Sequence, residues 1–147
     1  MAELPDPYCD AVLVGSIPVA TVYETDRVWA FHHPHPSFDP VHIVLIPKEH
    51  VDSLVTLPSH DVDLQLEVLR ALSVIGEEVV RAYGECQMHV NLGRYLHSGH
   101  LHIHVDVGPH VEKGLYAIEW GERVLMRGGA GRVGQVTPPA WRRTRSR

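Results

Sequence analysis

Cysteine is scarce in this chain, and no long apolar run is present. Only Cys9 and Cys86 occur among the 147 residues, too few for a disulfide scaffold. No apolar run approaches the roughly 20 residues that cross a bilayer. The start, residues 1–6, lacks the basic segment and apolar stretch of a secretory signal peptide. These absences exclude a membrane span and predict a cytoplasmic protein.

An excess of basic charge is also missing. Thirteen Lys and Arg stand against 18 Asp and Glu, for a net charge of −5, and four of the arginines lie within residues 142–147. An acidic body argues against a nucleic-acid-binding face, so any anionic substrate must be held by local groups. The length fits one domain with its own core.

Histidine, by contrast, is abundant. The chain has 12, concentrated in residues 32–60 and 89–110. The most informative run is His100-Leu101-His102-Ile103-His104-Val105. A strand alternates its side chains, which predicts three imidazoles on one wall and three apolar residues in a core. At about 3.3 Å per residue, neighbouring imidazoles lie roughly 6.6 Å apart, a spacing that suits a phosphate-sized ligand.

Three interpretations of this run remain open from the residues alone. Any half-solvated sheet alternates polar with apolar side chains. A catalytic or anion-binding wall is the second interpretation. The third is a metal site, because histidine is the commonest metal ligand; its candidate ligands are pairs drawn from His32, His33, His35, His100 and His102.

The remaining pattern predicts short elements around one long helix. Residues 6–15 begin with a capping Asp-Pro pair and predict a short helix, and residues 19–24 and 27–32 predict a hairpin. Residues 42–46 are apolar like a central strand. A helix should begin at Ser59 or Asp61 and end at Gly84, followed by strands at 86–92 and 100–107. We expect a further hairpin over 115–126, a domain covering 1–127, and a flexible tail at 128–147.

In order and spacing, several segments resemble the histidine triad family. They are Ile17-Pro18-Val19-Ala20, residues 23–32, residues 41–50, Asn91-Leu92-Gly93 and the run from His100 to Val105. The resemblance covers about residues 6–107. It implies an α+β fold with a five-stranded antiparallel sheet and two helices, usually as a homodimer. It also implies enzymes that attack the α-phosphorus of a nucleotide without a metal or other cofactor.

The resemblance also implies roles for individual residues. His102 matches the nucleophile that forms a covalent nucleotidyl-imidazole, and His100 matches a residue that orients it. The remaining matches are substrate contacts: His104 and His42 at the phosphate, Asn91, and Ile43 with Leu45 at the base and sugar.

Three positions depart from the family pattern. Leu96 and His97 stand where the family has a Gln and a Ser that contact the phosphate and protonate the leaving group. Because this loop is about two residues shorter, His97 or Ser98 is the candidate replacement. His33 stands where the family places an Asp that holds the ribose.

Some relatives hold structural zinc through a Cys-x-x-Cys near the N-terminus. This chain has Asp6-Pro7-Tyr8-Cys9 instead, and helix capping already explains Asp6. We therefore predict no metal site. The sequence favours a histidine triad hydrolase or nucleotidyl transferase acting on a nucleotide or related small phosphate substrate. A catalytically silent nucleotide-binding protein and a histidine-cluster metalloprotein are the alternatives.

Overall fold

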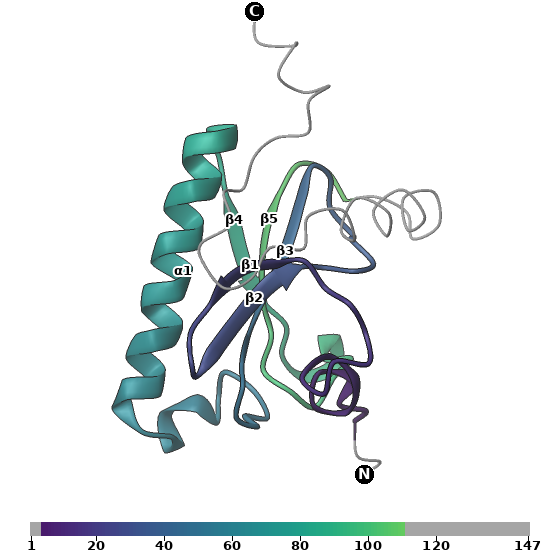
Figure 1. Ribbon diagram of the computed structural model, residues 1–147, viewed down its shortest axis with the longest axis vertical. Helices are drawn as coiled ribbons and strands as arrows, with labels where there is room; N and C mark the ends of the chain where they lie inside the picture. Colours follow the sequence, from purple (N-terminus) through teal and green to yellow (C-terminus); the bar gives the residue numbers. More distant parts are fainter. Residues whose placement is uncertain (1–3, 111–147) are drawn as a thin grey trace, which may run out of the picture.

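A computed structural model describes residues 4–110, which form one sheet and one long helix (Figure 1). The hairpin expected at 115–126, the domain boundary at 127 and the tail at 128–147 lie outside the described residues. In the described part of the chain, no helix is long and apolar enough to cross a membrane.

The sheet has five antiparallel strands in the order β1-β2-β3-β5-β4. Their bounds are β1 (Thr21–Glu24), β2 (Val28–His32), β3 (Val41–Pro47), β4 (Gln87–Val90) and β5 (Ile103–Val107). The expected hairpin of β1 and β2 is confirmed. Its turn is held by Thr25 Oγ1, which accepts hydrogen bonds from the N–H groups of Arg27 and Val28. The predicted α+β fold with a five-stranded antiparallel sheet is therefore confirmed.

Helix α1 (Val62–Tyr83) has the ends that the sequence predicts. Asp61 caps it by accepting from the Leu64 N–H at 3.0 Å, and Gly84 closes it in the left-handed conformation at φ 82°. The second expected helix is shorter: it is the five-residue π-helix η1 (Tyr8–Val12). Single-turn 3₁₀ helices η2 (Leu57–Ser59) and η3 (Gly93–Tyr95) lie in the connections.

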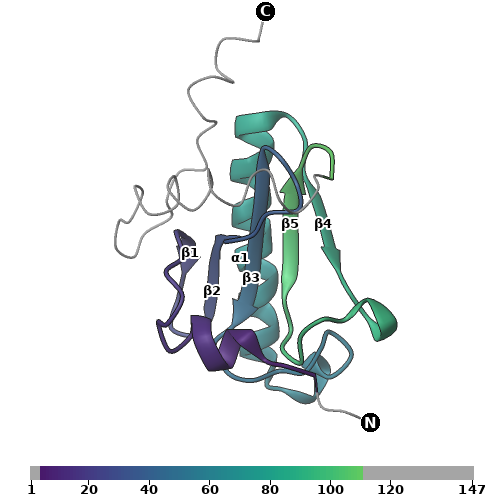
Figure 2. The ribbon, with the colours of Figure 1, turned by 90° about the vertical axis from the view of Figure 1, so that its right-hand side faces the viewer.

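The two faces of the sheet are covered differently. Helix α1 lies across one face, and η1 lies against the other (Figure 2). The main core fills the space beneath α1 and includes Ile43, Leu45, Ile103 and Val105. The smaller cluster beneath η1 consists of Tyr8, Val12, Phe31, Val44 and Ile46. Since β3 is buried on both sides, it is the central strand that its continuous apolar sequence predicts.

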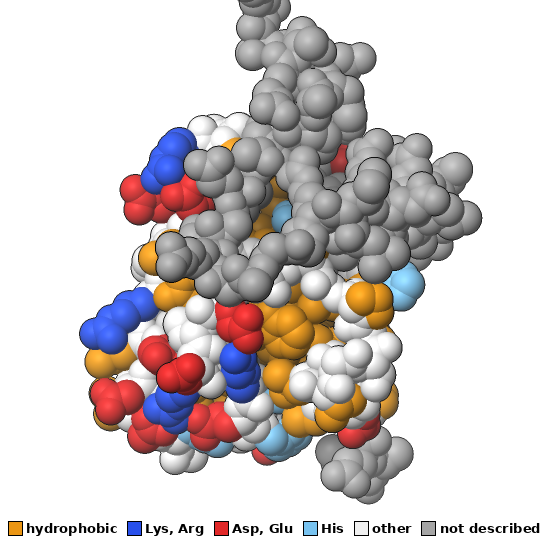
Figure 3. Space-filling view, in the orientation of Figure 1, with side chains coloured by type: hydrophobic (Ala, Val, Ile, Leu, Met, Phe, Trp, Pro, Cys, Tyr) orange, Lys and Arg blue, Asp and Glu red, His pale blue; other side chains and the backbone are white. Residues whose placement is uncertain are grey.

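Strand β5 begins later than expected, at Ile103 instead of His100. All five of its residues are buried, and so is His102 just before it, so a half-solvated sheet does not explain His102 and His104. On the face of the molecule in Figure 3, acidic and basic side chains intermingle near α1, and hydrophobic surface lies beside them.

Candidate functional site

A cluster of polar side chains occupies the sheet face opposite α1. His102 precedes β5, and His104 and Asp106 lie on it, in alternation with the core residues Ile103 and Val105. Neighbouring strands add two further histidines: His89 of β4 pairs with His104, and His42 of β3 pairs with Asp106. Strand periodicity therefore brings residues from three adjacent strands to one site.

Four imidazoles form a column across these strands. The rings of His33 and His42 stack with centroids 4.5 Å apart, and those of His104 and His89 stack at 4.6 Å. His42 and His104 connect the two pairs, with ring centroids 5.1 Å apart. The structure thus brings the candidate phosphate contacts His42 and His104 together with His33, at the family's ribose-holding position, and adds His89.

The hydrogen bonds within this column assign the ring protons. Nδ1 of His42 accepts from the Ser37 N–H at 2.8 Å, so Nε2 of the neutral ring carries the proton. This Nε2 lies 2.8 Å from Nδ1 of His104 and donates to it. The proton of His104 is therefore on Nε2, a buried atom that has no hydrogen-bond partner within residues 4–110. A buried unpaired donor is costly unless a ligand satisfies it.

His102 has the opposite tautomer. Its Nδ1 lies 2.7 Å from the carbonyl oxygen of His100, which can only accept. Nδ1 therefore carries the proton, and Nε2 presents a lone pair. The rings of Tyr8 and His102 pack with centroids 5.2 Å apart. The rings of His102 and His104 meet edge-on with centroids 5.1 Å apart. A nucleophilic nitrogen and a hydrogen-bond donor thus lie on adjacent rings.

Burial keeps these histidines neutral. It lowers the pKa of His42 to about 2 and that of His104 to about 3, and neighbouring imidazoles lower both values further. Burial also lowers the pKa of His102, against the opposing effect of the hydrogen bond to His100. The site therefore holds neutral donors and acceptors instead of fixed positive charges.

His89 and Asp106 were not anticipated from the sequence. Nδ1 of His89 lies 3.0 Å from Oδ2 of Asp106, whose side chain is 2% exposed. Burial raises the pKa of this carboxyl group, while His89 opposes the rise. The signal for Asp106 was available, because it continues the alternation of His102 and His104. His89 could be found only through the cross-strand register of β4 and β5.

The loop before β5 places the remaining candidates at different depths. Ser98 is buried, and its Oγ accepts from the His100 N–H at 3.2 Å, so it supports the backbone next to His102. His97 is exposed, but it lies close enough to His102 to lower the pKa of that ring. Asn91 is half-buried and directly follows β4. Ile43 and Leu45 lie in the core on the α1 side, so the structure does not bring them to the histidines.

His100 lies on the same side of the sheet as His102, as expected, because Leu101 joins Ile103 and Val105 in the core and Tyr8 contacts the rings of both histidines. Its side chain is fully buried, and its Nδ1 faces Asp6 and Cys9 while His50 packs edge-on. The alternation of side chains therefore begins before the first residue of β5, and the ring of His100 contacts residues beyond the end of the strand.

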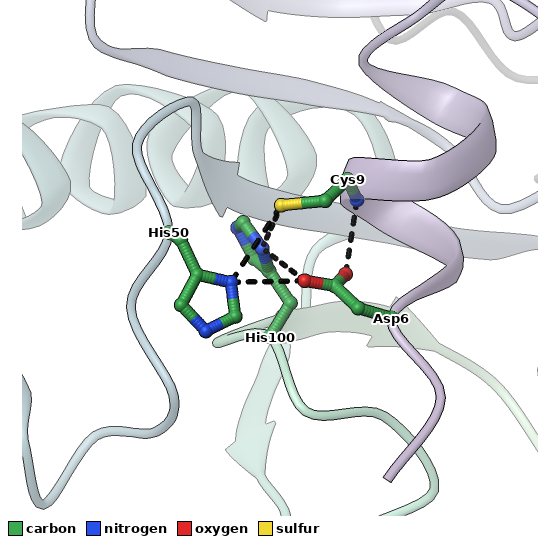
Figure 4. Close-up of side chains that lie close together, drawn as sticks. All are labelled: Asp6, Cys9, His50 and His100. Carbon is green, nitrogen blue, oxygen red and sulfur yellow. Dashed lines mark hydrogen bonds and ion pairs between the residues drawn. The ribbon is translucent and has the colours of Figure 1, made fainter. Parts of the chain in front are cut away.

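In residues 4–110, one group of three or more candidate metal ligands converges: Asp6, Cys9, His50 and His100 (Figure 4). Of the five histidines considered for a metal site from the sequence, this group contains only His100.

Comparison with known proteins identifies the family. A family model described as "Scavenger mRNA decapping enzyme C-term binding" matches residues 8–116. The fold and the histidine cluster are those of the histidine triad class. The chain belongs to the histidine triad family, which includes nucleotide-binding proteins and hydrolases.

Solved structures agree with this assignment. A Hit-like protein involved in cell-cycle regulation from Bartonella henselae is 25% identical with a TM-score of 0.61, covering 79% of this chain and 88% of that one. A HIT family hydrolase from Clostridium thermocellum is 25% identical with a TM-score of 0.59, covering 74% and 92%. A histidine triad protein from Clostridium difficile is 27% identical with a TM-score of 0.56, covering 78% and 100%.

Proposed function

We propose that this protein is a hydrolase or nucleotidyl transferase that acts at the α-phosphorus of a nucleotide substrate through His102. The observation that carries the proposal is the pairing of tautomers: a lone pair on Nε2 of His102 beside an unpaired N–H on Nε2 of His104. A phosphoryl group matches this pair, because it offers an electrophilic phosphorus and oxygens that accept hydrogen bonds.

The reaction has two steps. Nε2 of His102 attacks the α-phosphorus, a P–N bond forms, and the bond to the leaving group breaks with its electron pair. The ring becomes a positively charged nucleotidyl-imidazole, which the His100 carbonyl stabilises through the Nδ1–H. Water then attacks phosphorus and loses a proton, the P–N bond breaks, and neutral His102 is regenerated. In a transferase, another nucleophile replaces water.

The neighbouring histidines contribute a directed chain of donors. The Ser37 N–H fixes His42, His42 fixes His104, and His104 donates to a phosphate oxygen. These groups lie in a buried environment, where an aligned donor acts more strongly than in water. This series of hydrogen bonds supplies electrostatic stabilisation without a metal ion in the chemical step.

Capture of the intermediate tests the proposal. Protein mixed with a nucleoside 5′-phosphoramidate or a dinucleoside polyphosphate is quenched in denaturant without acid and digested. Mass spectrometry should find a nucleotidyl group on the peptide that contains His102, and none after His102→Asn. An adduct on a different residue, or turnover with no adduct in rapid-quench samples, would contradict the mechanism.

A catalytically silent nucleotide-binding protein is the second candidate. Its support is the replacement of the family's Gln and Ser by Leu96 and His97. Saturable nucleotide binding with no turnover of either substrate would favour it. We also propose a cytoplasmic homodimer, with no nucleic acid as partner. Sedimentation of the full chain tests the oligomeric state. The outer strands of the described sheet are β1 and β4.

A further inference from the structure

A buried carboxyl group lies among the imidazoles of the candidate phosphate site. Asp106 is the one acidic residue on β3, β4 and β5, and its side chain is 2% exposed. No lysine or arginine lies on these three strands. A phosphate that accepts a hydrogen bond from His104 therefore approaches a buried group that can carry negative charge. The low dielectric of a buried site strengthens the repulsion between two anions.

His89 is the polar partner of this carboxyl group. Nδ1 of His89 lies 3.0 Å from Oδ2 of Asp106. Both atoms are buried, and neither has another hydrogen-bond partner within residues 4–110. A carboxylate beside a neutral imidazole gives the pair a single negative charge, and one added proton makes the pair neutral. The charge that a bound anion meets therefore depends on this proton.

The ring of His89 connects the pair to the phosphate site. It stacks on His104 with centroids 4.6 Å apart and an angle of 13° between the planes. His89 pairs with His104 across β4 and β5, and Asp106 lies two residues further along β5 on the same face. Phe38 packs edge-on against His89 with centroids 5.7 Å apart. The pair therefore lies beside the ring whose Nε2–H has no partner within the described residues.

Burial acts in opposite directions on the histidines and on Asp106. It lowers the pKa of His42 to about 2 and that of His104 to about 3, so these rings stay neutral near pH 7. It also lowers the pKa of His102. It raises the pKa of Asp106, while His89 opposes the rise. A proton taken up near neutral pH therefore binds to the pair in preference to the other three rings.

Two more histidines approach this region from outside the strands. The ring of His33 stacks on His42 with centroids 4.5 Å apart. The ring of His110, which follows β5, packs edge-on against Phe38 with centroids 5.4 Å apart. Both rings can titrate near the site, so replacing each one distinguishes its proton from that of the pair.

We propose that His89 and Asp106 take up one proton from solvent when the phosphate of a nucleotide binds beside His104. The inference rests on the proposed phosphate contact of His104. The bound anion then meets a neutral pair instead of a single negative charge, so the proton determines the affinity of the site for anions. His89 is a specificity-determining residue in this scheme, and Asp106 is a positioning residue that acts through it. Lowering the pH should favour binding, because each ligand brings in one proton.

Proton uptake on binding tests the proposal. Calorimetry with AMP, GMP, CMP and UMP at pH 7.5, in buffers of different ionisation enthalpy, measures the protons bound per nucleotide. The second pKa of a phosphate monoester is about 6, so the ligand itself contributes few protons at this pH. Wild type should take up about one proton with the nucleotide that binds most tightly, and the matching nucleoside should cause no uptake. His33→Gln and His110→Gln should retain the uptake.

Asp106→Asn distinguishes this role from a structural one. The variant has no carboxylate to neutralise, so proton uptake should fall to near zero. Its affinity should stay within about twofold between pH 7 and pH 8.5, whereas that of wild type should fall by about tenfold or more. At pH 8.5 Asp106→Asn should bind the nucleotide more tightly than wild type. Loss of a purely structural residue would instead weaken binding at both pH values.

Three results would contradict the inference. Nucleotide binding without proton uptake in wild type would overturn it, as would equal uptake in wild type and folded Asp106→Asn. Both results leave the proposed chemistry of His102 intact, because capture of the adduct tests that chemistry separately. Absence of nucleotide binding to wild type would overturn this inference and the proposed function together.

Discussion

Nε2 of His42 donates a hydrogen bond to Nδ1 of His104 across 2.8 Å, and this bond determines that Nε2 of His104 carries the proton. The donor on His104 is set by a residue on another strand, which is in turn set by the backbone of Ser37. The polarity of the site therefore depends on the loop between β2 and β3.

Removing the nucleophile should abolish turnover. His102→Ala leaves no imidazole to form the covalent intermediate, so kcat/KM should fall by several orders of magnitude. Nucleotide affinity, measured by calorimetry, should change much less. His35→Ala is the matched control, because it also removes a histidine but at an exposed position, and it should retain the wild-type rate. A comparable rate in His102→Ala would exclude this residue as the nucleophile.

The leaving group should reveal the role of His97. Departure of an amine needs a proton, and general acid catalysis typically contributes 10²–10⁴-fold, whereas p-nitrophenolate departs without one. If His97 donates the proton, His97→Ala should lower kcat/KM for a phosphoramidate and leave that for a p-nitrophenyl nucleotide nearly unchanged. Equal effects on both substrates would assign His97 a role in binding or structure.

Acid should destabilise the fold through His42 and His104. Both have a folded-state pKa, about 2 and about 3, below the unfolded value of about 6.5. The unfolded chain binds these protons first as the pH falls, so stability is complete above about 6.5 and declines below it. Each histidine contributes up to about 1.4 kcal/mol per pH unit over that window.

Denaturant titrations at pH 7 and pH 5 measure this effect. His42→Gln should reduce the loss of unfolding free energy between the two pH values, because glutamine does not titrate. His35→Gln, the exposed control, should leave the loss unchanged. A pH dependence that is identical in wild type and His42→Gln would show that His42 is not held neutral.

Sugar selectivity should be weak. His33 occupies the position of a family carboxylate, and its Nδ1 already accepts from the His35 N–H at 3.0 Å. A carboxylate can accept from both ribose hydroxyls, whereas this neutral ring offers a donor only. Ribose and deoxyribose substrates should therefore differ by less than about tenfold in kcat/KM. His33→Asp should raise the preference for ribose; a strong preference in wild type would assign ribose binding to another residue.

Ile43 should act on stability and not on ligand affinity. It is fully buried beneath α1, so Ile43→Val should cost about 0.5–1.5 kcal/mol of unfolding free energy. The dissociation constant for nucleotide should stay within about twofold of wild type. Leu45→Met, also beneath α1, serves as a near-isosteric control. A marked loss of nucleotide affinity in folded Ile43→Val would restore the sequence prediction that this residue lines the pocket.

The sequence predicted correctly those features that depend on residues close together in the chain. Strand alternation placed His102 and His104 on one face, and Asp61 and Gly84 marked both ends of α1. The beginning of β5 was wrong by three residues, because the buried loop before it also alternates polar with apolar side chains. The predicted face of His100 is nevertheless confirmed, because Leu101 lies in the core with Ile103 and Val105.

Contacts between distant segments could not be read from the sequence. His89 reaches His104 only through the pairing of β4 with β5, and Asp6 reaches His50 only when η1 folds against the loop after β3. The role of His100 depends on its backbone carbonyl, which every residue possesses. Such roles follow from the register and the fold, since the residue type carries no signal for them.

Strand β5 separates two kinds of mutational sensitivity within a few residues. Ile103 and Val105 face the core beneath α1, whereas His104 and Asp106 face the column of imidazoles. A substitution at one position of the strand therefore affects the stability of the fold, whereas a substitution at the next position affects the chemistry of the site. A library that varies only alternate residues of β5 could remodel substrate preference while the hydrophobic half of the same strand continues to specify the fold.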